Sequence, residues 1–234
     1  MSPLLRVRAS ARWLIAGLLF LVTASTRAQP TAMPSPPSAS PVARSLSQAF
    51  EAAWATADGS GVTVAVLDTG VDTGHPDLAP NLAATSRHFL HDGANNALVG
   101  PDVEDGQGHG THVAGTIAAS MNGYGLAGIL PRATLVNLRA GQDSGFFFVD
   151  ATVNALTYAG DIGVDVVNMS FYVDPWLYNC TANPADTPAE QAEQRTIIDS
   201  VQRAVRYARG KGVTLISALG NEATDLGRPT LDPT

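Results

Sequence analysis

Short apolar runs alternate with amphipathic stretches along most of the chain. Four almost wholly apolar runs, rich in β-branched residues, lie at 62–67, 133–138, 164–169 and 213–217. Such runs are typical of strands that are covered on both faces. Between them, apolar residues at helical spacing predict helices over 109–119, 149–159 and 189–209. This alternation predicts an α/β three-layer sandwich, with a mainly parallel sheet and helices on both faces.

The last of these helices has clear end signals. Thr187 is a good N-cap residue, Pro188 suits the first helical position, and Glu190 supplies the acid of a capping box. Gly210 and Gly212 are expected to end the helix.

The first 28 residues predict a secretory signal peptide. Three arginines precede an unbroken apolar run over 13–22, and a small-residue cleavage pattern follows at 26–28. A transmembrane helix is the alternative, but ten residues rise only about 15 Å, roughly half of a bilayer core. We therefore expect a secreted protein without a stable membrane anchor.

Residues 29–45 are rich in Pro, Ser and Ala and predict a linker. A folded domain is then expected over 46–234, beginning with an amphipathic helix at 46–57.

Charge and cysteine content narrow the function. Without residues 1–28 the chain has 10 Lys and Arg against 21 Asp and Glu, a formal charge of −11. A nucleic-acid partner is therefore not expected. Cys180 is the single cysteine, so it either stays free or pairs with a cysteine outside this sequence.

Two segments carry residues suited to acid–base chemistry. Asp68 directly follows the first apolar strand, so its carboxylate is expected at the carboxyl edge of the sheet, where functional groups gather. His109 opens the next helix in a Gly-rich segment that would let the helix start pack tightly. Taken alone, Asp68 is better explained as a turn residue before Gly70.

Zinc binding by His109 and His112 is a weaker alternative. The metalloprotease motif needs histidines four apart with a glutamate between them, whereas these histidines are three apart with glycine and threonine between them.

Together these segments resemble the subtilisin family. Its members carry Asp-[Ser/Thr]-Gly after the first strand and His-Gly-Thr-His-Val-Ala-Gly on the following helix, and both motifs stand here at 68–70 and 109–115. Val-Val-Asn-Met-Ser at 166–170 is similar to the family's substrate-binding strand, and Ala-Leu-Gly-Asn-Glu at 218–222 to its oxyanion segment.

The resemblance implies a role for each matching residue. His109 would be the general base of a serine protease, and Asp68 would orient it. Asn221 would donate its amide to the oxyanion, although by itself it is more typical of a turn. Ser170 would belong to the substrate-binding strand. Protein or peptide substrates and a monomer are expected.

The nucleophilic serine of the family is not found in this sequence. No Gly-Thr-Ser-Met-Ala or Gly-x-Ser-x-Gly segment occurs, so we expect the serine to lie beyond Thr234 and this chain alone to be almost inactive. A non-catalytic secreted relative that binds peptides or protein partners is the alternative function.

Further departures concern maturation and the cleft. A linker of this length cannot hold the folded inhibitory propeptide common in the family, so the maturation route stays open. After Ser170 the sequence continues with Phe171 where the family usually has a short apolar residue and glycines. This bulk is expected to narrow or reshape the cleft.

A structural calcium site is also implied by the resemblance. Asp77, in a His-Pro-Asp segment, and Asn122, in the loop after the histidine helix, occupy the places of family calcium ligands. Both residue types are equally typical of ordinary turns. No cofactor is expected for the chemistry itself.

Overall fold

The structure, a computed structural model, describes residues 49–90 and 102–221. The predicted signal peptide (1–28) and linker (29–45) lie outside these residues. Within them the chain forms one five-stranded sheet with the strand order β2-β3-β1-β4-β5, and all pairs are parallel. The strands are β1 (Thr63–Asp68), β2 (Arg87–His88), β3 (Thr134–Arg139), β4 (Val166–Met169) and β5 (Thr214–Ser217).

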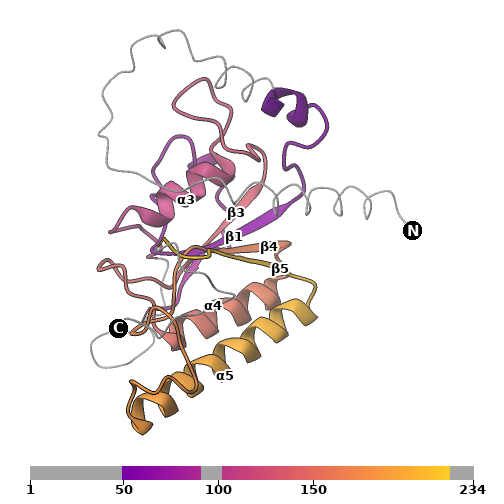
Figure 1. The fold of residues 1–234 in the computed structure, drawn as a ribbon. Coiled ribbons are helices and arrows are strands. Elements are labelled where there is room, and N and C mark those ends of the chain that lie inside the picture. The colour runs from indigo at the N-terminus through magenta and orange to yellow at the C-terminus, as the bar shows by residue number, and fades with distance from the viewer. Residues whose placement is uncertain (1–48, 91–101, 222–234) are drawn as a thin grey trace.

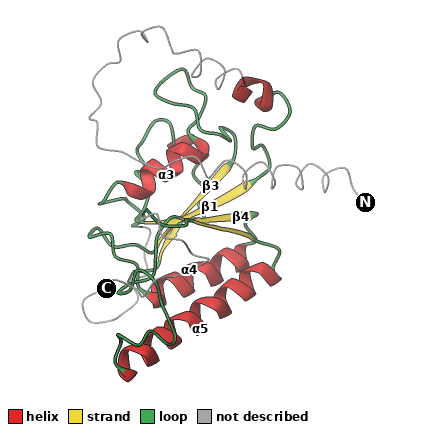
Figure 2. Ribbon diagram, viewed as in Figure 1, coloured by secondary structure: helices red, strands yellow, loops and turns green. Residues whose placement is uncertain are grey.

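Helices cover both faces of the sheet, as Figure 1 shows: α3 (His109–Ala118) lies on one side, α4 (Val149–Ile162) and α5 (Pro188–Gly210) on the other. The same layers can be followed by secondary structure in Figure 2. Alternate residues of β1 explain its continuous apolar run. Val64 and Val66 pack in the core on the α3 side, while Ala65 and Leu67 pack in the core under α4 and α5. The predicted three-layer α/β fold is confirmed.

The element boundaries agree with the sequence to within a few residues. The capping box of α5 is present, because Glu190 N donates to Thr187 Oγ1 and the Thr187 N–H donates to the Glu190 carboxylate. Helix α4 continues three residues past the predicted end and stops at Gly163, whose φ of 70° favours glycine. At the start of the domain, residues 49–54 are helical.

Two short elements were not predicted. Strand β2 has only two residues, and the 3-10 helix η2 (Ala79–Asn81) only three. Neither is long enough to show a periodic pattern of apolar residues.

The strand topology gathers the predicted catalytic and substrate-binding residues at one edge of the sheet. Because all five strands are parallel, their carboxyl ends meet at the same edge. Asp68 ends β1, which is central, Ser170 follows β4, and Asn221 lies four residues after the end of β5. Among the described residues, no helix has the length and apolar content to cross a membrane.

Candidate active site

Asp68 and His109 are in contact at the carboxyl edge of the sheet. Nδ1 of His109, the first residue of α3, lies 2.7 Å from Oδ1 of Asp68. The Asp68 side chain is fully buried, whereas 44% of the His109 side chain is exposed. The same carboxylate oxygen also accepts the N–H of Thr69 at 2.8 Å. One carboxylate oxygen of Asp68 therefore accepts a hydrogen bond within its own turn and also contacts an imidazole that is partly exposed to solvent.

Helix α3 begins very close to the end of β1. The N–H of Gly110 donates to Thr69 Oγ1 at 3.0 Å. A Cβ added at Gly110 would lie 2.1 Å from the carbonyl oxygen of Gly70 and 3.0 Å from Cβ of Asp68. Only glycine permits this approach, as the sequence predicts, and the approach is what brings the imidazole to the carboxylate.

The electrostatics of the pair favour a protonated imidazole. The hydrogen bond to Asp68 raises the pKa of His109, burial lowers it, and the negative charges of Asp68 and Asp105 raise it again. The net result is a pKa above the ordinary value of about 6.5. An imidazole stabilised in its charged form by a buried carboxylate can take up a proton from a nucleophile.

Asp105 is a residue of this site that the sequence analysis did not identify. Its Oδ1 accepts the hydroxyl of Thr69 at 2.8 Å and the N–H of Gly108 at 2.8 Å. Its Oδ2 accepts both the N–H (2.8 Å) and the hydroxyl (2.6 Å) of Thr111. An acid just before a helix start is a usable sequence signal. Here Gly108, which has no side chain, stands at the N-cap position and obscured that signal.

Ser170 and Asn221 follow two neighbouring strands, β4 and β5, at the same edge of the sheet. The Ser170 hydroxyl is half-buried and accepts the side-chain amide of Asn168 at 3.0 Å. Asn221 is exposed. Adjacent strands lie about 4.8 Å apart, so β5 is about 10 Å from β1 in the plane of the sheet. The topology thus brings both residues to the edge that carries Asp68, and their roles stay predictions.

Phe171, the bulky residue after Ser170, is stacked on a second phenylalanine. The rings of Phe171 and Phe147 lie 4.0 Å apart at an interplanar angle of 6°. Phe147 is buried, and its backbone exchanges hydrogen bonds of 2.7 and 2.8 Å with the buried Asp174. A Cβ on Gly141 would lie 2.4 Å from the Phe147 ring. The stacked pair is therefore held firmly beside the predicted substrate-binding strand.

Asp77 and Asn122 are also brought together. The Asn122 amide donates to Asp77 Oδ1 at 3.0 Å, and the N–H of Leu126 donates to Oδ2 at 3.3 Å. Asp77 is buried, which suits a carboxylate that organises a loop. Carboxylate and amide oxygens are calcium ligands, but in the structure the Asn122 side-chain oxygen accepts the N–H of Tyr124 at 2.9 Å. The residue chemistry therefore fits calcium, whereas the hydrogen bonds fit the turn interpretation.

The zinc alternative has little geometric support. His112 is exposed on α3. The described part of the chain contains no group of three or more His, Cys, Asp or Glu residues that could hold a metal ion.

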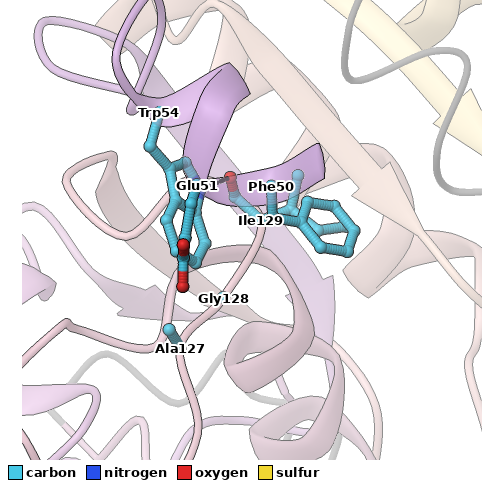
Figure 3. Close-up of a pocket in the computed structure, with 6 residues that line it drawn as sticks. All are labelled: Phe50, Glu51, Trp54, Ala127, Gly128 and Ile129. Carbon is cyan, nitrogen blue, oxygen red and sulfur yellow. Dashed lines mark hydrogen bonds between the residues drawn. The ribbon is translucent and has the colours of Figure 1, made fainter. Parts of the chain in front are cut away.

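A pocket of about 290 Å³ has none of the predicted site residues in its lining, and Figure 3 shows the residues that do line it. It is bounded by the helix at 49–54 and the segment 127–129, where Trp54 Nε1 donates to the carbonyl of Ile129 at 2.8 Å. These segments precede β1 and β3, so the pocket belongs to the amino edge of the sheet and holds none of the predicted site residues.

A family profile and several known proteases are similar in sequence to this chain. The subtilase family profile matches residues 59–233. Thermitase from Thermoactinomyces vulgaris is 34% identical over 170 residues, which are 72% of this chain and 50% of the relative. Subtilisin Savinase from Lederbergia lenta is 36% identical over 163 residues, which are 70% of this chain and 49% of the relative. The major intracellular serine protease of Bacillus subtilis (strain 168) is 34% identical over 165 residues, which are 70% of this chain and 44% of the relative. The chain thus spans half or less of the length of each.

Solved structures show the same fold. Sphericase superposes with a TM-score of 0.55 at 32% identity, covering 72% of this chain and 49% of that chain. The nisin leader peptidase NisP from Lactococcus lactis superposes with a TM-score of 0.63 at 24% identity, covering 76% and 48%. At 24% identity the second likeness bears on the fold alone.

Proposed function

The chain belongs to the subtilase family, and we propose that it is part of a secreted serine endopeptidase that hydrolyses peptide bonds in proteins or peptides. The observation that carries the proposal is the 2.7 Å contact between Nδ1 of His109 and Oδ1 of Asp68. It is supported by the position of Asp68 at the carboxyl end of the central strand. The protein acts as a monomer and has no nucleic-acid partner.

In the proposed mechanism, Asp68 fixes the imidazole. Nδ1–H of His109 donates to the carboxylate, which leaves Nε2 as the basic nitrogen. Nε2 takes the proton of a serine hydroxyl as that oxygen attacks the scissile carbonyl, and later gives the proton to the leaving amine. Asp68 stabilises the imidazolium that forms between these two steps.

Asn221 and Ser170 act on the substrate side. The Asn221 amide donates to the oxyanion of the tetrahedral intermediate, a contact worth about 3 to 4 kcal/mol in subtilisin. The segment at Ser170 receives the substrate backbone. The placement of both after β4 and β5, at the edge that carries Asp68, supports these roles.

The nucleophilic serine is proposed to lie in a part of the protein outside these 234 residues. Residues 1–28 are proposed to direct secretion, which rests on their arginine-rich, apolar and small-residue pattern. One relative is intracellular by its name, so family membership alone leaves the location undecided.

The function is tested on the whole protein that contains this chain, recovered from culture medium. We expect hydrolysis of a denatured protein substrate that a serine-directed phosphonate abolishes. Peptide binding without hydrolysis would support the non-catalytic alternative. Hydrolysis that resists the phosphonate but is lost with a chelator would support the zinc alternative.

The pH dependence of this activity follows from the His109 pKa. The neutral imidazole is the base, and its pKa is raised above about 6.5 by Asp68 and Asp105. Activity should therefore be lost as the pH falls through this raised value. A profile of kcat/KM against pH, measured with an uncharged peptide, should show an acid limb with its midpoint above 6.5. A midpoint below 6.5 would contradict the electrostatic account of the pair.

The stacked phenylalanines should restrict the cleft beside Ser170. Replacing Phe171 with alanine removes one ring of the stack, so large substrate residues should be accepted there. We expect kcat/KM for such peptides to rise about tenfold, the scale set by small changes in an apolar pocket. Tyr172→Ala is the matched control, because Tyr172 is an exposed neighbour. A wild-type enzyme that prefers large residues at every nearby subsite in a peptide library would contradict this prediction.

Calcium is proposed as a structural ion held through Asp77 and Asn122. Ligand binding at 100 times Kd stabilises a fold by about 2.7 kcal/mol. Chelation should therefore lower Tm by about 5 to 10 °C for a domain of this size. Asp77→Asn should remove the difference between calcium-loaded and chelated protein. Equal Tm values for the wild type in both conditions would favour the turn interpretation.

A further inference from the structure

We propose that Asp105 is a positioning residue that sets the place of His109 against Asp68. This inference rests on the proposed function, because it concerns the base of that reaction. Asp105 accepts hydrogen bonds from the residue that follows Asp68 and from residues on both sides of His109. One carboxylate thus joins the two segments that carry the pair.

The first link runs to the end of β1. Thr69 is covalently next to Asp68, and its hydroxyl donates to Asp105 Oδ1 at 2.8 Å. The same hydroxyl accepts the N–H of Gly110 at 3.0 Å. Thr69 therefore binds both Asp105 and the residue after His109, and it is fixed from both sides.

The second link runs to the first turn of α3. The N–H groups at a helix start have no partner within the helix and need other acceptors. Asp105 accepts those of Gly108 and Thr111, while Gln107 Oε1 accepts that of His109 at 2.8 Å. Thr111 adds its hydroxyl to Asp105 Oδ2 at 2.6 Å. Because Gly108 offers no capping side chain, these contacts fix the position of the turn that carries the imidazole.

The charge of Asp105 is retained in this setting. Burial raises the pKa of Asp105. Hydrogen bonds from Thr111, Gly108 and Thr69 together lower the pKa by more than burial raises it, so it lies below the usual range of an aspartate. Nearby Arg139 pairs with Asp102 and Asp143. Among the described residues, no basic side chain forms an ion pair with Asp105. A negative charge at a helix N-terminus is favourable, and it also acts on the imidazole.

Asp105 touches neither the reacting atoms nor the imidazole directly. Its effect on the reaction therefore passes through the geometry of His109 and through its charge. Small misplacements of a catalytic group cost about 100-fold in rate. We expect Asp105→Asn to lower kcat about 10- to 100-fold with KM nearly unchanged, and to move the acid limb of the pH profile to lower pH.

The experiment compares matched variants of the whole protein. Asp102→Asn removes the same charge from an exposed acid three residues earlier and should leave kcat within about twofold of the wild type. Thr69→Val removes the hydroxyl link without a charge change and should lower kcat, whereas Thr69→Ser should restore it. NMR titration of the His109 ring gives a readout that does not need activity. Tm values accompany each variant.

The outcomes separate the two proposals. An inactive wild type would contradict the proposed function, while the NMR titration would still decide the role of Asp105. Equal kcat values and equal His109 pKa values in Asp105→Asn and Asp102→Asn would overturn the inference. If Asp105→Asn does not fold, the threonine pair decides: equal kcat values for Thr69→Val and Thr69→Ser would overturn it.

Discussion

Replacement of His109 with alanine should lower kcat for peptide hydrolysis by about a millionfold, because it removes the proposed general base for the serine proton. Asp68→Asn should cost less, about ten-thousandfold, since the imidazole is kept but its tautomer is no longer fixed. The His109 side chain is partly exposed, so its removal should leave the fold intact. Single-turnover kinetics with an activated peptide ester would measure both losses.

His112→Ala is the control for this comparison. His112 lies on the same helix and is exposed, so its removal should change kcat by less than about twofold. A His109→Ala enzyme with activity close to that of His112→Ala would contradict the assignment of His109 as the base.

Replacement of Gly110 with alanine should destabilise the protein by about 2 kcal/mol or more. Alanine gains about 1 kcal/mol in helix propensity over glycine. Against this, its Cβ would lie 2.1 Å from the backbone oxygen of Gly70, and overpacking costs about 1 to 3 kcal/mol or more. The nearest clashing atom is a backbone carbonyl oxygen, which cannot move aside as the end of a flexible side chain can, so the upper end of that range applies.

Gly115→Ala provides a control on the same helix. Nothing lies within 4 Å of a Cβ added at Gly115, so this change should stabilise the fold by about 1 kcal/mol. Urea unfolding of both variants would measure the difference. Equal stabilities would show that α3 is not held against β1 as closely as described. Gly110→Ala should also lower kcat, because relief of the clash must move His109 away from Asp68.

The layers of the fold could be predicted from local patterns, whereas the pairing of Asp68 with His109 was predicted from the resemblance of their two motifs to the subtilisin family. The apolar runs predicted four of the five strands, because strands buried on both faces leave a continuous signal. The capping box at Thr187 located the start of α5, because its two hydrogen bonds span only three residues. Parallel topology then placed Asp68 at the edge where the chemistry is expected.

The rest depends on contacts between distant segments. The stack of Phe147 and Phe171 joins two loops, and neither loop carries a periodic pattern. Strand β2 exists only through its pairing with β3. The hydrogen bond from Thr69 to Asp105 joins residues that are 36 positions apart in the sequence. The sequence could therefore show that an acid precedes a helix, but not which residue that acid binds.

Fluorophosphonate labelling of the whole protein, followed by mass spectrometric mapping, would show whether Asp68 and His109 activate a serine outside these 234 residues. We expect one labelled serine, located outside these 234 residues, and almost no label in His109→Ala. A label on a serine within residues 1–234, or undiminished labelling of His109→Ala, would contradict this expectation.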